Sequence, residues 1–340
     1  MKPTAIDLFS GCGGLSQGLK QAGFQVKVAV EIDKETVNTY ELNHPETITI
    51  NKDIKDVEVS EIKNAANVDK IDLIAGCPPC QGFSKIGSLN KNNRYNDPRN
   101  ELVMEFFRIV NGIRPNFIML ENVPGLLHYD LFKQIIFDLE EIGYFLDVKI
   151  VNIADYGVPQ RRKRLVLLGS KLGSVTIPEN LGLPTKTVRD FIYNLPNVQD
   201  SDDPLHKIHS SHGEKVKKII SLIPKNGGSR TELPKEYWLD CHKKNDVGYS
   251  DVYGRLSWDK VSSTITGGCL NPSKGRFLHP VENRSITARE AALLQTFPKD
   301  YQFSTHSKDK LAQMIGNAFP PKFSEIQGKY IKELIELVKS

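Results

Sequence analysis

Short apolar runs alternate with amphipathic segments along the first half of the chain. Runs typical of buried strands lie near 5–9, 26–31, 48–50, 71–75, 117–121 and 164–169. Between them, apolar residues recur at helical spacing near 14–22, 34–43, 100–113 and 130–142. Strands that alternate with helices favour a parallel sheet with helices on both faces. The pattern therefore predicts an α/β fold built on a doubly wound sheet.

The hydrophobic periodicity of the sequence changes near residue 181. From there to about 289, prolines and glycines interrupt short segments and the periodicity is lost, which predicts a smaller, loop-rich domain over 181–289. Helical patterns return at 287–295, 307–314 and 320–338. We therefore expect a first domain over 1–180, the loop-rich domain, and a C-terminal part over 290–340 that returns to the first.

Composition narrows the class of protein. Hydrophobic residues make up 39% and charged residues 25% of the 340, which is ordinary for a soluble globular protein. No run approaches the roughly 18 apolar residues of a membrane span, and the start runs directly into a strand that contains Asp7, so no signal peptide is expected. Five cysteines without a pairing pattern fit a reducing cytoplasm.

Basic residues gather in three segments. These segments are 85–99, 161–164 and 206–230, whereas the first 76 residues carry eight lysines against twelve acidic residues. A single basic run is usually a solvated surface, but three such segments around one candidate nucleophile favour a polyanionic substrate such as nucleic acid.

That candidate nucleophile is Cys80. It lies in the sequence Pro78-Pro79-Cys80-Gln81, directly after the apolar run 71–75, so a rigid turn at a strand end would hold its thiol. Two other interpretations exist: a small buried hydrophobe, or a C-x-x-C pair with Cys77 in redox chemistry or a zinc site. A structural zinc site usually needs a second pair, and Cys12, Cys241 and Cys269 stand alone. No metal site is expected.

The turn after the first strand has the composition of a nucleotide-binding loop. It reads Phe9-Ser10-Gly11-Cys12-Gly13-Gly14, and its glycines let backbone amides approach a ligand. The chain has no G-K-[ST], which excludes a P-loop, and Ser16 stands where a dinucleotide pattern has its third glycine. Glu31 and Asp53, at successive strand ends, suit ribose hydroxyls and an adenine amino group. A nucleoside cofactor fits this set better than NAD.

Taken together, these segments resemble the cytosine-C5 DNA methyltransferases of bacterial type II restriction–modification systems. The resemblance covers nearly the whole catalytic domain in the order of the family, whereas 181–289 resembles its target-recognition domain only in position. The matching segments are Asp7-Leu8-Phe9-Ser10-Gly11-Cys12-Gly13-Gly14, Glu31-Ile32-Asp33, Asp53-Ile54, Pro78-Pro79-Cys80-Gln81, Glu121-Asn122-Val123, Gln160-Arg161-Arg162-Lys163-Arg164, Arg289-Glu290-Ala291-Ala292 and Gly316-Asn317-Ala318.

The resemblance implies roles for four catalytic residues. Cys80 would attack C6 of cytosine as a thiolate, which turns C5 into a nucleophilic carbon. Glu121 would donate a proton or hydrogen bond to N3, and Arg162 and Arg164 would hold the cytosine O2 and an adjacent phosphate. The rigid duplex requires the cytosine to flip out, and the loop 84–99 is expected to close on the DNA.

The resemblance also implies S-adenosylmethionine as the cofactor in a Rossmann-like methyltransferase domain. Phe9 would pack on the adenine or methionine, Glu31 would bind the ribose, and Asn317 would complete the site from the C-terminal part. The other expected cofactor-binding residues are Gly11, Gly14, Asp53, Ile54, Pro79 and Leu102.

Double-stranded DNA and a companion restriction endonuclease are expected on the same basis, and a monomer is expected because no interface pattern stands out in the sequence. Cys77 departs from the family pattern and suggests a disulfide with Cys80 on oxidation. Candidate base readers lie in 242–255 and 269–276, where Lys243, Lys244, Tyr249, Tyr253, Arg255, Lys274 and Arg276 cluster. An RNA cytosine methyltransferase, a catalytically silent DNA-binding relative and an NAD-dependent oxidoreductase are the alternatives. The size of 181–289 favours duplex DNA over RNA, because a sequence reader needs surface for several base contacts.

Overall fold

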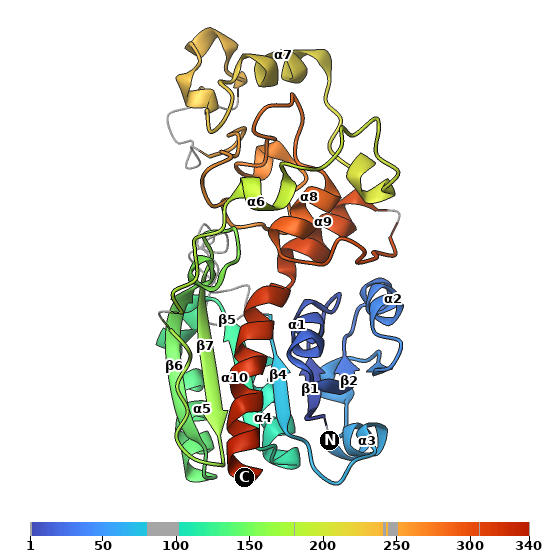
Figure 1. The fold of residues 1–340 in the computed structure, drawn as a ribbon, viewed down its shortest axis with the longest axis vertical. Coiled ribbons are helices and arrows are strands. Elements are labelled where there is room, and N and C mark those ends of the chain that lie inside the picture. The colour runs from blue at the N-terminus through green and yellow to red at the C-terminus, as the bar shows by residue number, and fades with distance from the viewer. Residues whose placement is uncertain are drawn as a thin grey trace. The chain divides into compact units, whose positions relative to one another are not determined.

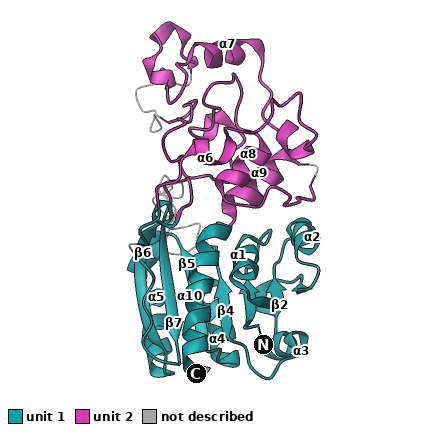
Figure 2. Cartoon of the chain, viewed as in Figure 1, with its two compact units in different colours: residues 1–156, 163–183, 319–340 teal, residues 157–162, 184–318 magenta. Residues whose placement is uncertain are grey.

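A computed structural model describes residues 2–79, 102–179, 181–240, 243, 251–305 and 307–339; Figure 1 shows its elements. The chain forms two compact units, which Figure 2 colours separately. Unit 1 comprises residues 1–156, 163–183 and 319–340, and unit 2 comprises 157–162 and 184–318. Each unit groups the residues that make most of their contacts with one another. The division by function into 1–180, 181–289 and 290–340 stays a prediction.

Unit 1 is built on a seven-stranded sheet of order β3-β2-β1-β4-β5-β7-β6. Its strands are β1 (Thr4–Leu8), β2 (Gln25–Val30), β3 (Ile48–Ile50), β4 (Leu73–Gly76), β5 (Phe117–Asn122), β6 (Phe145–Asn152) and β7 (Lys163–Ser170). The first five strands run parallel, and β7 is antiparallel to both β5 and β6. The predicted α/β class with a doubly wound sheet is confirmed.

Helices cover both faces of this sheet. They are α1 (Gly14–Ala22), α2 (Lys34–Asn43), α3 (Val59–Ala66), α4 (Leu102–Ile113), α5 (Asp130–Glu141) and α10 (Pro321–Lys339). Buried apolar residues of α3, α4 and α5 pack on the strands in one core cluster, and α10 packs along α1. The predicted helices near 14–22, 34–43, 100–113 and 130–142 are confirmed.

Helix α10 joins the end of the chain to its beginning. A Cβ on Gly18 of α1 would lie 2.2 Å from the Pro321 oxygen, and one on Gly328 of α10 would lie 2.8 Å from the Ala22 Cβ. The two helices therefore approach backbone to backbone through glycines. The Ser324 hydroxyl donates a hydrogen bond of 2.8 Å to the Leu15 oxygen. Residues more than 300 positions apart thus belong to one packed layer.

The sequence pattern missed two elements of unit 1. Strand β6 lies at the edge of the sheet, where Phe145 is 55% and Ile150 45% exposed. Its alternating pattern was masked because it follows the helical segment 130–142 almost without a break. Helix α3 spans only two turns and buries Ile62 and Ala66, which is too short a pattern to separate from a loop.

Unit 2 is rich in loops and short helices. Its α-helices are α6 (Val188–Ile192), α7 (Glu214–Leu222), α8 (Ala288–Leu294) and α9 (Lys308–Asn317). A small core forms around Ile219, Ile220, Ile223, Val252, Tyr253 and Leu278. The helices predicted near 287–295 and 307–314 are α8 and α9, and the one predicted at 320–338 is α10.

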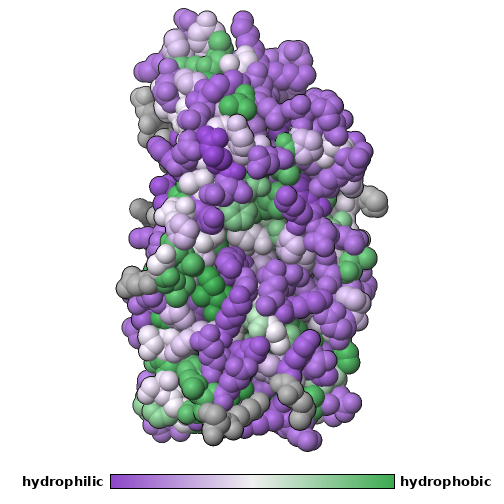
Figure 3. Space-filling view, viewed as in Figure 1, coloured by the Kyte–Doolittle hydropathy of each residue, from purple (hydrophilic) through white to green (hydrophobic). Residues whose placement is uncertain are grey.

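Hydrophilic residues dominate the face shown in Figure 3, and apolar residues form separate patches on it. Within the described parts of the chain, no helix has both the length and the apolar character needed to cross a bilayer.

Candidate active site

The ends of three parallel strands place the predicted catalytic segments side by side. Leu8 of β1 pairs with Gly76 of β4, and Gly76 pairs with Leu120 of β5. The glycine turn, the segment that leads to Cys80, and Glu121 therefore start from neighbouring positions at one edge of the sheet. Ligands of open α/β sheets bind at this carboxyl edge. Cys80 itself and the loop 84–99 lie outside the described residues.

Glu121 and Arg164 form an ion pair at this edge. Nε of Arg164, the second residue of β7, lies 2.6 Å from Oε1 of Glu121, and the side chains are only 16% and 9% exposed. Antiparallel pairing of β5 with β7 brings the beginning of β7 beside the end of β5, which is why residues 43 positions apart meet. The guanidinium therefore places a positive charge against a nearly buried carboxylate, although Oε1 accepts no hydrogen bond of good geometry among the described residues.

Asn122, the next residue of β5, holds the turn that leads to Cys80. Its Nδ2 donates a buried hydrogen bond of 2.9 Å to the Pro78 oxygen, and its Oδ1 accepts one from the Val123 nitrogen. Pro79, which the resemblance assigns to the cofactor, is exposed, and Cys77 is half-buried beside the end of β1, where its nitrogen donates to the Leu8 oxygen. The turn is thus attached to both flanking strands.

The turn after β1 has the strained backbone expected of a ligand-binding loop. Phe9 has φ 60°, a left-handed conformation that is uncommon for a bulky residue, and Gly11 and Gly13 have φ 54° and 94°. Gly14 begins α1, with Gly13 as its N-cap. The positive end of the nine-residue helix therefore follows the turn directly. Burial in this turn raises the pKa of the Cys12 thiol to about 12, which makes it inert.

Glu31 reaches back to this turn from the end of β2. Its Oε2 accepts a hydrogen bond of 3.0 Å from the Gly11 nitrogen, and its Oε1 accepts one of 2.9 Å from the Asp33 nitrogen. Asp33 then caps α2 by accepting from the Thr36 nitrogen. These two backbone nitrogens orient both carboxylate oxygens of Glu31 at the end of β2.

The other predicted cofactor residues of unit 1 contribute in different ways. Asp53 is half-buried at the end of the loop after β3 and accepts a hydrogen bond from the Lys55 nitrogen. The Ile54 side chain is 4% exposed and belongs to the core, so it offers a ligand only its main chain. Leu102 is half-buried in the first turn of α4, packed against the same core.

Arg162 and Asn317 belong to unit 2. Nη1 of Arg162 donates hydrogen bonds of 3.1 Å and 3.0 Å to the oxygens of Ile265 and Gly316, and the residue is 4% exposed. Asn317 is exposed at the end of α9. A Cβ on Gly316 would lie 2.0 Å from the Thr266 carbonyl carbon, so only glycine fits before Asn317. Arg162 therefore holds the backbone that presents Asn317.

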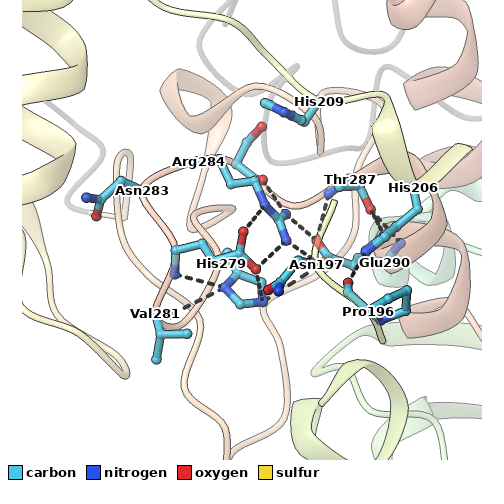
Figure 4. Close-up of polar contacts among 12 residues, drawn as sticks. Pro196, Asn197, His206, His209, His279, Val281, Asn283, Arg284, Thr287 and Glu290 are labelled. Atoms are coloured by element: carbon cyan, nitrogen blue, oxygen red, sulfur yellow. Dashed lines mark hydrogen bonds and ion pairs between the residues drawn. The ribbon is translucent and has the colours of Figure 1, made fainter. Parts of the chain in front are cut away.

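The segment Arg289-Glu290 of α8 is buried in unit 2, and Glu290 belongs to the polar network of Figure 4. Arg284 Nη1 donates a hydrogen bond of 2.8 Å to Glu290 Oε2, whose other donor is the Thr287 nitrogen at the start of α8. The His279 ring lies against this pair, and burial lowers its pKa to about 4. Arg284 holds the pKa of the Glu290 carboxyl below its usual range. This segment stabilises unit 2.

Two of the candidate base readers have structural roles instead. Arg255 is 0% exposed and donates to the oxygens of Ile220, Ile223 and His279. Arg276 Nη1 donates to the oxygens of Gly227, Gly228 and Arg255. The expectation that Arg255 faces DNA is wrong, because the loops of this unit use its guanidinium to satisfy their own carbonyl groups. Lys244 and Tyr249 lie outside the described residues.

Known proteins share both the sequence and this architecture. The family pattern of the C-5 cytosine-specific DNA methylases matches residues 4–333. The chain belongs to this family. It is 36% identical to the Type II methylase M.HgiDII of Herpetosiphon aurantiacus, over 99% of this chain and 97% of that protein. It is 35% identical to the Type II methyltransferase M1.HphI of Haemophilus parahaemolyticus, over 96% of this chain and 85% of that protein.

A solved structure confirms the fold class. A proposed DNA modification methyltransferase encoded within a prophage of E. coli has a TM-score of 0.72 and 30% identity, covering 98% of this chain and 99% of that one. This C-5 cytosine-specific DNA methylase is thus a DNA cytosine-5-methyltransferase of the Type II class. This assignment excludes the oxidoreductase interpretation of the glycine turn.

Sequence reasoning missed three residues that shape the site of this methylase. Ile32, between Glu31 and Asp33, leaves 63% of its apolar surface exposed. Asn51 Nδ2 donates to the oxygens of both Glu31 and Ile32 at 2.9 Å. Asn122 was noted only as part of a motif. An apolar residue between two acids was a usable signal for Ile32, but the two asparagine contacts depend on tertiary structure.

Proposed function

We propose that this chain methylates C5 of a cytosine within a short sequence of duplex DNA, with S-adenosylmethionine as the methyl donor and Cys80 as the covalent nucleophile. The observation that carries the proposal is the Glu121–Arg164 pair, 2.6 Å apart, on the strand next to the one that leads to Cys80. Asn122 supports it, because its bond to Pro78 ties that turn to the Glu121 strand.

The chemistry requires one nucleophile and one acid. The Cys80 thiolate forms a bond from Sγ to C6, and Glu121 relieves the charge pushed into the ring by donating a proton or hydrogen bond at N3. C5 would then take the methyl group while the sulfonium leaves as the neutral thioether S-adenosylhomocysteine. Loss of the C5 proton to a solvent base and return of the N3 proton to Glu121 would then expel the Cys80 thiolate and restore the aromatic ring. Arg164 lies against Glu121, and the family resemblance assigns the cytosine O2 and an adjacent phosphate to Arg162 and Arg164.

The residues at the β1 and β2 ends fit S-adenosylmethionine, which supplies an activated methyl group when bound. Glu31 places a carboxylate oriented by two backbone nitrogens where ribose hydroxyls would bind, and exposed Ile32 offers an apolar surface to a flat base. Phe9, Gly11 and Gly14 bring the strained turn and the start of α1 to the same end. Asp53, Ile54, Pro79, Leu102 and Asn317 are assigned to the cofactor by the resemblance.

The cytosine has to leave the helix before Sγ can reach C6. Flipping costs a few kcal/mol, about the cost of unstacking and unpairing one base, and contacts with the DNA repay it. Unit 2 supplies a surface of a size suited to reading several base pairs. We assign the recognition of the DNA sequence to unit 2. The methylation it directs would protect host DNA from a companion restriction endonuclease.

Bisulfite sequencing at base resolution tests the whole proposal. DNA is taken from a methylation-free bacterial host that expresses the wild type, with a Cys80→Ser variant as the control. Protected cytosines that share one short motif, absent in the control, are expected. Unprotected DNA from a host with soluble wild-type protein would overturn the proposal, and the same readout on RNA would then decide for the RNA alternative.

The covalent step has its own test. An oligonucleotide of the protected motif with 5-fluorocytosine at the target cannot lose a proton from C5, so the Sγ–C6 bond should persist. A denaturation-resistant protein–DNA adduct is expected for the wild type in the presence of S-adenosylmethionine and none for Cys80→Ser. Methylation of ordinary DNA without an adduct on the fluorinated DNA would exclude covalent attack by Cys80.

A further inference from the structure

A buried chain of three polar side chains joins strand β1 to helices α1 and α2. The Ser16 hydroxyl donates a hydrogen bond of 2.6 Å to Oδ2 of Asp7 and lies 2.7 Å from the Tyr40 hydroxyl. Their exposed fractions are 0%, 1% and 0%. Since Ser16 has one hydroxyl proton and gives it to Asp7, the Tyr40 hydroxyl is the donor to Ser16. The chain therefore runs from α2 through α1 to β1.

His44, at the end of α2, makes a second connection to the same place. Its ring centroid lies 4.7 Å from that of Tyr40, and its side chain hydrogen-bonds to the Gly13 backbone. Gly13 is the N-cap of α1 and a member of the glycine turn. Helix α2 therefore contacts the beginning of α1 at two points, Ser16 and Gly13.

Together with Glu31, these contacts attach both ends of α2 to the glycine turn of the proposed cofactor site. Glu31 stands three residues before α2 and is bonded to the Gly11 nitrogen of the turn. Tyr40 and His44 bind the other end of α2 to the residues that follow that turn. The glycine turn is thus fixed to the segment 31–44 at both ends of α2, once directly through the ribose carboxylate and once through the buried hydroxyls.

Burying these polar side chains costs free energy that apolar side chains in the same place would not. Oδ1 of Asp7 has no hydrogen-bond partner among the residues that the structure describes. Burial raises the pKa of the Asp7 carboxyl to about 7. Buried polar groups stabilise less than apolar ones of the same volume, but their hydrogen bonds fix one orientation. Orientation is what the turn requires if its amides and Glu31 are to meet one ligand together.

We propose that Tyr40, Ser16 and His44 are positioning residues of the cofactor site, which set the affinity for S-adenosylmethionine by fixing the glycine turn relative to Glu31 without touching the ligand. The inference rests on the proposed function, because it takes this end of the sheet as the cofactor site. It also gives Ser16 a role. A glycine there, as in the dinucleotide pattern, would leave the Tyr40 hydroxyl and the Asp7 carboxylate without their shared partner.

The test is a matched pair of tyrosine substitutions. Tyr40→Phe removes the hydroxyl that starts the chain. Tyr144→Phe removes another buried hydroxyl of unit 1, which donates 2.7 Å to the Pro115 oxygen before β5. Binding of S-adenosylmethionine is measured by calorimetry on the full chain, together with KM, kcat at saturating cofactor, and the thermal midpoint. Ser16→Ala serves as the second variant, because it breaks the chain and keeps the Tyr40 ring.

Tyr40→Phe and Ser16→Ala are each expected to raise Kd and KM for S-adenosylmethionine about tenfold, the effect of one buried hydrogen bond, with kcat nearly unchanged. Tyr144→Phe is expected to lower the thermal midpoint about as much as Tyr40→Phe does, but to keep the wild-type Kd for S-adenosylmethionine. Wild-type Kd in folded Tyr40→Phe and Ser16→Ala would overturn the inference, as would an equal rise in Tyr144→Phe. A wild type that does not bind S-adenosylmethionine would overturn the proposed function before any variant is compared.

Discussion

Asn122 donates a hydrogen bond of 2.9 Å from Nδ2 to the Pro78 oxygen, and so connects the end of β5 to the turn two residues before Cys80. The acid and the nucleophile of the proposed reaction come from different strands. A single buried hydrogen bond therefore helps to set the distance between them, and this distance decides whether C6 and N3 of one ring can be reached together.

Asn122→Ala is expected to lower kcat at least tenfold with little change in KM for the cofactor, because the turn that carries Cys80 loses its attachment. Methyl transfer to DNA of the target motif measures this. Asn116→Ala is the control, since Asn116 is also buried and bonds Asp72 from the opposite end of β5. Equal kcat values in the two variants would contradict the positioning role of Asn122.

Arg164 is expected to stabilise unit 1 mainly by pairing with Glu121. Arg164→Met leaves a carboxylate that is 9% exposed without its partner, which costs about 3 kcal/mol of unfolding free energy. Adding Glu121→Gln should restore a large part of this loss. Urea unfolding of the wild type, both single variants and the double variant measures the coupling. Additive losses would show that the pair contributes no interaction energy.

Asp7 makes the stability of unit 1 fall as the pH rises. Its pKa is raised from 3.8 to about 7, chiefly by burial, with the Glu31 charge adding to the effect and Ser16 opposing it. The folded state therefore holds a proton that the unfolded state has lost between about pH 4 and pH 7. Relative to Asp7→Asn, the wild type should lose about 1.4 kcal/mol per pH unit across this window.

Urea unfolding followed by circular dichroism from pH 4.5 to 8 tests this for both proteins. The difference in unfolding free energy should level off above about pH 7, where Asp7 is ionised in both states. A constant difference at all pH values would show that Asp7 does not titrate in this window.

His279 gives unit 2 the opposite pH dependence. Burial lowers its pKa from 6.5 to about 4, although Glu290 and Glu282 face its Nε2 at 3.7 Å and 3.8 Å. Between these pH values His279 binds a proton in the unfolded state but not in the folded state. The unfolding free energy of unit 2 should therefore fall by up to about 1.4 kcal/mol per pH unit as the pH falls from 6.5 to 4.

Tryptophan fluorescence reads this effect selectively, because both tryptophans of the chain, Trp238 and Trp258, lie in unit 2. The urea midpoint by fluorescence should fall on acidification in the wild type and fall less in His279→Gln, which keeps an acceptor for the Val281 and Glu282 nitrogens. Identical acid sensitivity in the two proteins would assign the effect to another group.

The sequence predicted six of the seven strands and the α/β class, because buried strands are continuous apolar runs. It predicted Glu121 at a strand end, where the structure places it beside Arg164. The roles of the site residues, Glu121 included, stay predictions. The sequence failed where one side chain serves two distant segments. Nothing local distinguishes buried Arg255 from a surface arginine, or connects Tyr40 to Ser16, 24 positions away.

Helix α10 has a consequence for how the protein is made. Unit 1 begins with the first strand but is complete only when residues 319–340 pack on α1. During translation the glycine turn and α1 emerge first. The side of α1 that packs on α10 stays uncovered while unit 2, an insertion in unit 1, is synthesised. A ribosome that stops before α10 thus releases a chain in which α1 lacks the helix that packs along it.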